Sequence, residues 1–278
     1  MPKRLKITIL SDDRAARGLE ARHGLSILVE ADGRKMLLDA GQKGEAAANA
    51  QALGIDLAQV EAVVLSHGHY DHCGGLLKIL KAAPGATIYC HRRALDERYS
   101  QQKGQAAREV GMPPLVREHL LALGRQKFKR PCHSRQMLPG VWTTGAVARR
   151  SPFEQPEDCF TLDREGKAPD PIIDDQGLWI ETPRGLVVVT GCAHAGIVNT
   201  VRQAIKFSVR HRLLAVVGGF HLGSAGSERL ERTAQGLKAL KPGLVVSCHC
   251  TGQEAEARLE KALGKAFRRG YAGLRLEL

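Results

Sequence analysis

Three histidines and one aspartate stand within six consecutive residues, in the stretch His-Gly-His-Tyr-Asp-His. They are His67, His69, Asp71 and His72, in a chain of 278 residues that has only eleven histidines. Neutral imidazoles and carboxylates are the ligands that zinc, manganese and iron accept. Alternate side chains of an extended backbone point the same way, so His67 and His69 can reach one ion, while Asp71 and His72 point towards a second. The stretch therefore predicts a centre for one or two divalent ions per chain, zinc first, with manganese or iron as alternatives.

Four predicted strands end in a histidine, which indicates one shared site. The runs are VVLSH, VVVTGCAH, AVVGGFH and VVSCH, and they end at His67, His194, His221 and His249. Ligands gather at the carboxyl ends of strands in open α/β folds. A single histidine in such a place is more often a buried structural residue, but four of them favour a common site.

The rest of the pattern predicts the elements that would position these histidines. Asp-Gly and Pro-Arg pairs separate two apolar runs each, and this predicts hairpins at 26–30 with 35–39 and at 177–182 with 185–190. Further strands are predicted at 6–10, 61–65, 86–90, 213–217 and 244–247, and helices at 44–53, 75–82, 116–123, 197–209, 228–240 and 254–269. We interpret 1–278 as a single domain in which about 92–170 form a basic insertion with loops and a helical hairpin.

Four motifs, in order along nearly the whole chain, resemble the signature of the metallo-β-lactamase fold superfamily. They are Leu37-Leu38-Asp39-Ala40-Gly41, the stretch from His67 to His72, Thr190-Gly-Cys-Ala-His194, and His249. The resemblance implies an α/β (α+β) fold, a four-layer αββα sandwich with the site at the edge of the two sheets.

The same resemblance implies two ligand sets. One ion would be held by His67, His69 and His194, and the other by Asp71, His72 and His249. Asp39 would support the metal loop from behind, although an aspartate before Ala-Gly can also simply cap a turn.

One position departs from the family pattern. Many members with two ions have a bridging aspartate at a strand end, where this chain has Gly218-Gly219-Phe220-His221. A histidine cannot bridge two ions through one atom as a carboxylate can, so we expect His221 either to bind one ion or to face the substrate as an acid or base. Asp71 could orient the nucleophile or accept its proton, which makes Asp71 and His221 the catalytic candidates. The second ion should be held more weakly.

A smaller group gives a closer resemblance. GCAHAGIVNT, GGFHL and CHCTG, with His23-Gly24-Leu25-Ser26, resemble proteins grouped with 7,8-dihydropterin-6-methyl-4-(β-D-ribofuranosyl)aminobenzene-5′-phosphate synthase. That resemblance implies a condensing transferase that joins two anionic partners and releases pyrophosphate.

Three functions therefore stay open. The first is a metal-dependent hydrolase of an anionic, phosphorylated small molecule that uses a metal-activated water. The second is the condensing transferase. The third is a redox or metal-sensing protein, because Cys73, Cys248 and Cys250 adjoin the metal motifs and thiolates favour zinc or iron.

Composition bears on partners and location. The net charge is +12, and the segment 92–135 has eleven Lys or Arg against four Asp or Glu, which favours anionic partners or is simply a solvated basic surface. Aromatic residues are 4%, so no nucleic acid is expected. No long apolar run or signal segment is visible, so we expect no membrane partner and a cytoplasmic location, with a homo-oligomer possible.

Two aspartates and four further histidines stand outside the histidine motifs. Asp174 and Asp175 either reach the site or form a turn. The other histidines considered are expected to be structural or on the surface: His91, His119, His133 and His211.

Overall fold

Two seven-stranded β-sheets pack face to face in the computed structural model, which describes residues 1–102, 104–210 and 212–278. The first sheet contains β1 (Leu5–Ser11), β2 (Ser26–Ala31), β3 (Arg34–Leu38), β4 (Val60–Val64), β5 (Thr87–Tyr89), β8 (Phe128–Lys129) and β17 (Arg275–Glu277). The second contains β9 (Gln136–Leu138), β10 (Val141–Thr143), β12 (Gly177–Thr182), β13 (Gly185–Thr190), β14 (Leu213–Gly219), β15 (Leu244–Cys248) and β16 (Phe267–Arg269). Their strand orders are β17-β1-β2-β3-β4-β5-β8 and β16-β15-β14-β13-β12-β10-β9.

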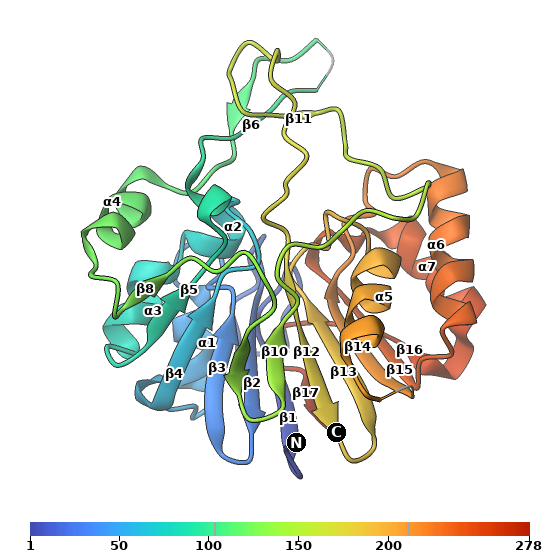
Figure 1. Ribbon diagram of the computed structural model, residues 1–278, viewed down its shortest axis with the longest axis horizontal. Helices are drawn as coiled ribbons and strands as arrows, with labels where there is room; N and C mark the ends of the chain where they lie inside the picture. Colours follow the sequence, from blue (N-terminus) through green and yellow to red (C-terminus); the bar gives the residue numbers. More distant parts are fainter. Residues whose placement is uncertain (103, 211) are drawn as a thin grey trace.

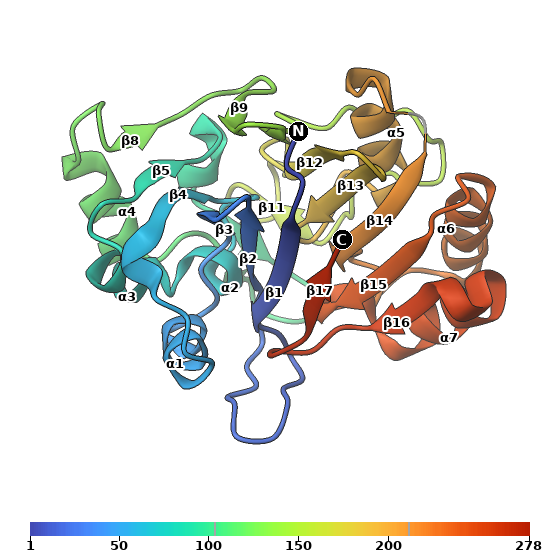
Figure 2. The ribbon, with the colours of Figure 1, turned by 90° about the horizontal axis from the view of Figure 1, so that it is seen from below.

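Helices cover the outer face of each sheet (Figures 1 and 2). The first sheet is covered by α1 (Glu45–Ala52), α3 (Leu76–Ala82) and α4 (Pro114–Ala122), and the second by α5 (Ile197–Phe207), α6 (Ser227–Ala239) and α7 (Gln253–Leu263). The layers are therefore helix, sheet, sheet, helix. This confirms the predicted αββα sandwich.

The strands are apolar on both sides because each sheet is buried on both faces. In β2, Ile27 and Val29 face the core between the sheets, while Leu28 faces the helices. In β13, Val187 and Val189 face the other sheet, whereas Leu186 and Val188 pack against α5 and its neighbours. Alternation with a period of two residues thus supplies both the central core and the two outer cores.

Shorter elements complete the fold. A third sheet, in the order β11-β6-β7, stands above the rim of the sandwich in Figure 1 and consists of β6 (Tyr99–Ser100), β7 (Arg108–Glu109) and β11 (Phe160–Thr161). The four-residue helix α2 (Tyr70–Cys73) follows the first histidines, and 3-10 turns occur at Leu57–Gln59, Arg92–Leu95, His249–Thr251 and Gly264–Ala266.

The segment 92–170 differs from the expectation. Its described residues contain one α-helix, α4, so the helical hairpin was wrong. Part of the segment also extends the main sheets, because β8 pairs with β5 and β10 pairs with β12. Strands of two or three residues are too short for hydrophobic periodicity to reveal them.

Two predicted helices end earlier than expected. The last helix ends at Leu263, not at Arg269, because Gly264 adopts φ 55° and the chain continues as β16. The helix expected at 197–209 ends at Phe207. The strand β17 was not expected. His211 lies outside the described residues.

Within the described part of the chain, no helix has both the length and the apolar character that crossing a membrane requires.

Candidate metal centre

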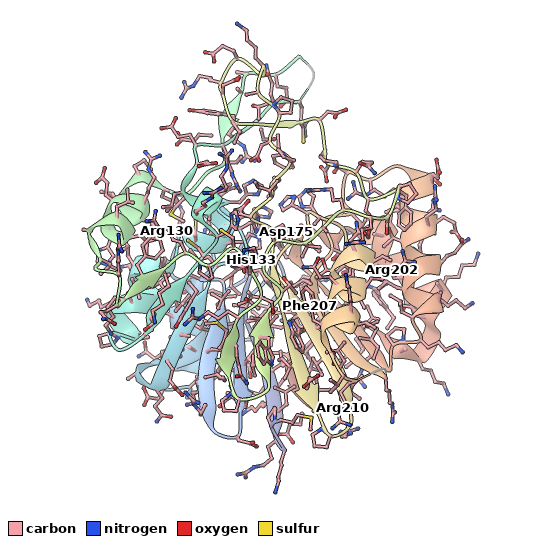
Figure 3. All side chains as sticks on the ribbon, viewed as in Figure 1. Arg130, His133, Asp175, Arg202, Phe207 and Arg210 are labelled. Atoms are coloured by element: carbon pink, nitrogen blue, oxygen red, sulfur yellow. The ribbon has the colours of Figure 1, made fainter. Side chains whose placement is uncertain are left out.

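The predicted ligands lie at one rim of the sandwich, where the two sheets meet. Asp39 follows β3 and His67 follows β4, and these strands are parallel. His194, His221 and His249 follow β13, β14 and β15, which are also parallel neighbours. Carboxyl ends of parallel strands share one edge, so each sheet brings its polar residues to the same rim. Figure 3 shows this region, around Asp175, between the upper ends of the two sheets.

Three of the histidines form a cluster that we call the imidazole group: His67, His69 and His194. His67 Nε2 lies 3.0 Å from His69 Nδ1. The ring of His194 lies 4.7 Å from that of His67 and 4.9 Å from that of His69, measured between centroids. All three side chains are at least 95% buried. The structure therefore brings together the three residues expected to share one ion.

The other three expected ligands also meet, in what we call the carboxylate group: Asp71, His72 and His249. Asp71 Oδ2 lies 3.1 Å from His249 Nε2 and 3.8 Å from His72 Nε2. The ring centroids of His67 and His72 are only 4.3 Å apart, so the two groups adjoin.

Asp39 lies behind this pair of groups, where the resemblance implied. Its Oδ2 is 2.7 Å from His72 Nδ1 and accepts a hydrogen bond from Ser66 Oγ at 2.7 Å. Its Oδ1 accepts from the backbone N–H of Ser66. A carboxylate in this position fixes the ring orientation of a metal-binding histidine.

His221 lies beside the imidazole group. Its ring centroid is 4.0 Å from that of His194, and its Nε2 is 3.2 Å from Glu157 Oε1. Phe160 packs against the rings of His69, His194 and His221, so the small third sheet closes one side of the site.

Further residues contact the predicted ligands. Cys192 Sγ lies 3.0 Å from His72 Nε2 and 3.1 Å from Cys250 Sγ. Asp13 Oδ1 is 2.7 Å from His249 Nδ1, and His23 Nε2 is 3.3 Å from Asp71 Oδ2. Cys250 and His23 belong to motifs named from the sequence, whereas no site role was predicted for Cys192 or Asp13. Cys192 had a readable signal, since it precedes His194 by two residues as His67 precedes His69.

Asp174 and Asp175 support the site from below its loops. Asp174 Oδ2 accepts a hydrogen bond from Gly68 N, and its Oδ1 pairs with the buried Arg98 at 2.6 Å. Asp175 Oδ2 accepts from Ala195 N, next to His194. They therefore contact the ligand loops through the backbone.

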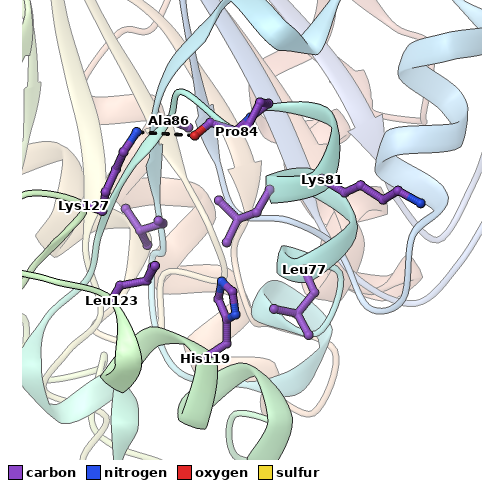
Figure 4. A pocket seen from close by; sticks show the side chains of 9 residues that line it. Leu77, Lys81, Pro84, Ala86, His119, Leu123 and Lys127 are labelled. Carbon is purple, nitrogen blue, oxygen red and sulfur yellow. Dashed lines mark hydrogen bonds between the residues drawn. The ribbon is translucent and has the colours of Figure 1, made fainter.

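The other thiols and histidines lie outside the two groups. Cys73 and Cys248 are fully buried, and burial raises the pKa values of both thiols. His91 accepts a hydrogen bond from Arg93 N at the start of a 3-10 turn. His133 forms a β-bridge with Gly145, and His119 of α4 lines a mainly apolar pocket beside α3 (Figure 4).

The two groups differ in their electrostatics. Burial lowers the pKa values of His67, His69 and His194 well below that of free histidine, so these imidazoles are neutral. Burial acts the same way on His72, but Asp39 and Asp71 outweigh it and raise its pKa.

His249 and Asp71 follow the pattern of the carboxylate group. Burial lowers the pKa of His249, but Cys250, Asp13 and Asp71 outweigh it and raise that pKa well above the usual value. Burial raises the pKa of Asp71, but His72 and His249 outweigh it and hold that pKa well below the usual range.

The backbone at the site is unusual. Asp39, Ala193, His221 and His249 have φ of 64°, 52°, 45° and 48°, in the left-handed region that non-glycine residues seldom adopt. Each such residue costs on the order of 1–3 kcal/mol, and these conformations cluster at functional sites. Gly191 is also required, because a Cβ there would collide with Ser66 Oγ behind the metal loop.

The donor atoms fit a divalent ion. His67, Cys192 and His194 each offer a ligand atom, all within 4.8 Å of one another, and so do His72, Cys192 and His249. His194 Nε2 and His69 Nε2 are buried, and among the described residues neither has a hydrogen-bond partner. Unpartnered buried nitrogens are costly unless a ligand engages them.

Comparisons with known proteins show which family the chain resembles. Residues 19–249 match the model of the metallo-beta-lactamase superfamily. The chain is 30% identical to the 7,8-dihydropterin-6-methyl-4-(beta-D-ribofuranosyl)-aminobenzene-5′-phosphate synthase of Methanocaldococcus jannaschii, over 97% of this chain and 95% of that one.

Solved structures extend the comparison. The crystal structure of Tm1679, a metal-dependent hydrolase of the beta-lactamase superfamily, has a TM-score of 0.83 and 31% identity and covers 99% of both chains. Zn(2+)-bound PqqB from Methylobacterium extorquens, at 18% identity and a TM-score of 0.57, shares the fold over 98% of this chain and 100% of that one. Since the family model and two relatives of at least 30% identity span most of its length, the chain belongs to the metallo-β-lactamase superfamily.

Proposed function

We propose that the protein is a metal-dependent hydrolase of an anionic, phosphorylated small molecule. The observation that carries the proposal is the meeting of the imidazole and carboxylate groups at one rim, where His69 and His194 have nitrogens without a partner among the described residues. Burying so many polar side chains costs more free energy than burying apolar ones would, so the stability of the fold does not explain the cluster.

The residues divide between two ions. His67, His69 and His194 would hold one, and Asp71, His72 and His249 the other, with zinc the best match to imidazole donors and manganese or iron as alternatives. When bound, the ions would activate a water and stabilise charge on the phosphoryl oxygens. Asp39 would keep His72 oriented through the 2.7 Å contact described above.

His221 and Asp71 would handle protons. Burial lowers the pKa of His221, but Cys250 and Glu157 outweigh it and raise the pKa to about 10. A protonated His221 suits the role of acid towards the leaving group better than that of base. Asp71, whose lowered pKa keeps it ionised, can accept a hydrogen bond from the nucleophile.

Two arginines support an anionic substrate. Arg149 Nη2 donates to the carbonyl oxygen of His194 at 3.1 Å, and its buried Nε has no partner in the described part of the chain. Arg108 lies 5.7 Å from the ring centroid of Tyr70, the residue before Asp71. Arginine pairs with two phosphate oxygens at once, so both can hold a phosphate beside the ions.

The basic residues of 92–135 do not all serve this role. Arg98 is 1% exposed and pairs with Asp170 at 3.1 Å and with Asp174 at 2.6 Å, so it is structural. Arg149, outside that segment, was not anticipated.

A second function has specific support. The 30% identity to the Methanocaldococcus synthase over nearly the whole chain favours a condensing transferase that would use the same ions to stabilise a diphosphate leaving group. The two functions differ in product, because only the transferase releases pyrophosphate with transfer to a second organic molecule.

The test combines metal analysis with substrate screening. Elemental analysis should find one to two divalent ions per chain, and phosphorylated substrates should be turned over faster than neutral esters or lactones. Turnover of the phosphorylated substrates should fall with salt as the screening length shrinks from about 10 Å at 0.1 M to about 3 Å at 1 M. Equal salt sensitivity for neutral and charged substrates would contradict the anionic-substrate proposal.

A variant at Arg149 sharpens this test. Arg149→Ala should raise KM for a phosphorylated substrate by about 10- to 100-fold, the value of a lost charged hydrogen bond of about 1.5–3 kcal/mol. The control is Arg150→Ala, because the neighbouring Arg150 is exposed. Equal effects from both variants would remove Arg149 from the substrate site.

A further inference from the structure

One sulfur atom lies at the junction of the two ligand groups. The Sγ of Cys192 is within 4.8 Å of donor atoms of His67 and His194, and also of His72 and His249. It forms a third such group with His221 and Cys250. Donor atoms of five histidines thus lie around a buried thiol that the expected ligand sets leave unused.

We propose that Cys192 is a thiolate ligand shared by the two ions, and that Cys250 is a further sulfur ligand beside it. The proposal rests on the metal binding of the proposed function. The Cys192 thiolate would take the place of the bridging carboxylate that this chain lacks at 218–221.

Bond lengths permit this arrangement. Zinc lies about 2.3 Å from sulfur and about 2.0–2.1 Å from imidazole nitrogen, so a sulfur and a nitrogen on one ion are at most about 4.4 Å apart, and two sulfurs at most about 4.6 Å. The 3.0 Å between Cys192 Sγ and His72 Nε2, and the 3.1 Å between the two sulfurs, lie within that limit. A thiolate has several lone pairs and can bind two ions through one atom, which an imidazole nitrogen cannot.

The backbone is shaped to admit both sulfurs. Gly219 N donates to Gly191 O at 2.8 Å, which draws the end of β14 against the loop that carries Cys192. A Cβ at Gly219 would lie 2.6 Å from Gly191 O, 2.9 Å from Cys250 Sγ and 3.4 Å from the Cα of Cys192. Glycine at the strand end therefore permits both the close approach of the two backbones and the position of the Cys250 thiol.

An unpartnered nitrogen points to a ligand in the same place. His194 Nε2 is buried and has no hydrogen-bond partner in residues 1–102, 104–210 and 212–278. His194 shares a donor group with Cys192.

A disulfide between Cys192 and Cys250 is the competing explanation. The sulfurs are 3.1 Å apart, whereas a disulfide bond is about 2.05 Å. The thiols are free in the structure. Thiolate ligands would make the centre select zinc, iron or cobalt over magnesium and calcium.

The test uses the full chain, reduced and then loaded with Co²⁺ alone. Thiolate bound to Co²⁺ gives a charge-transfer absorption in the near-ultraviolet that imidazole and carboxylate ligands do not give. The wild type should show this band and bind two ions. Cys192→Ser should lose most of the band and bind about one ion, and Cys250→Ser should lose a smaller part. Cys132→Ser, at a thiol outside the donor groups, is the control and should keep the full band.

A second measurement uses only the wild type, so it does not depend on whether the variants fold. In the wild type, bound Co²⁺ should slow alkylation of Cys192 and Cys250 at least about tenfold, and that of Cys132 not at all. Two bound ions without a charge-transfer band would overturn the inference and leave the proposed function standing. Failure to bind any ion would contradict both. A band unchanged in Cys192→Ser, or a Cys192–Cys250 disulfide that reforms in place of metal binding, would also overturn it.

Discussion

The imidazole group and the carboxylate group lie side by side, but the ring nitrogens of their histidines have different partners. In the carboxylate group each histidine already has an acidic partner, Asp39 for His72 and both Asp13 and Asp71 for His249. In the imidazole group, His194 Nε2 is unpartnered within the described residues, and burial keeps all three rings neutral.

This difference bears on how each group takes up a cation. The rings of the imidazole group are already neutral, which is the metal-binding form, so an ion need not displace an imidazolium proton from them. In the carboxylate group the raised pKa values of His72 and His249 favour the protonated rings, and a metal must displace those protons. The two groups should therefore differ in affinity, in pH dependence and in their response to mutation.

The largest effect is expected from removing the imidazole group. His67→Ala/His69→Ala should lose at least one ion per chain and lower turnover by more than about 100-fold, beyond the 10- to 100-fold typical of changes behind the ligands. Elemental analysis and kinetics measure both. His119→Ala, at the pocket in Figure 4, is the control, and full metal content in the double variant would contradict the ligand assignment.

The next effect concerns the scaffold of the imidazole group. Arg98→Ala should lower the free energy of unfolding by about 3–5 kcal/mol, because it leaves Asp174 and Asp170 buried without their cation. Asp174 holds Gly68, so the imidazole group should be disturbed more than the carboxylate group. Denaturant unfolding compares it with Arg125→Ala, an exposed arginine of the same segment. A loss below about 1 kcal/mol would refute the structural role.

A smaller and more selective effect is expected at Asp39. Asp39→Asn keeps the shape but removes the charge beside His72, so affinity for the ion of the carboxylate group should fall by about 10- to 100-fold. The ion of the imidazole group should stay bound. Stepwise chelator titration separates the two, and Asp32→Asn on the surface is the control. Equal weakening of both ions would erase the distinction between the groups.

The last effect is a difference in pH dependence between the two groups. His72 and His249 have raised pKa values, so each ring keeps its proton to a higher pH than a free histidine does and loses it as pH rises. Affinity for the second ion should therefore increase with pH by up to about tenfold per unit for each displaced proton. The imidazole group, with lowered pKa values, should show a flatter dependence between pH 6 and 8. Calorimetric titration of the protein with metal across that range measures both affinities. If the affinities of the two ions changed equally with pH, the proposed difference between the groups would be wrong.

The parts of the site that could be predicted from the sequence are those that stand next to a strand in a regular pattern. The stretch from His67 to His72 and the strand-end histidines were recognisable because strand ends share an edge whatever the loops do. Glu157, Asp13 and Arg149 come from irregular segments, where no periodicity relates position to direction. Their contacts depend on how loops fold over the rim, which local propensity does not encode. The same holds for β8, β16 and β17, which are only two or three residues long.

The strand β17 has a consequence for synthesis of the chain. It pairs with β1, so that Leu276 lies opposite Ile7, and it covers what would otherwise be the free edge of the first sheet. A ribosome makes β1 first and β17 more than 260 residues later. During that interval β1, a buried seven-residue strand, presents unpaired N–H and C=O groups to other nascent chains. Chaperone demand and aggregation during expression should therefore depend on β17, which is translated long after β1.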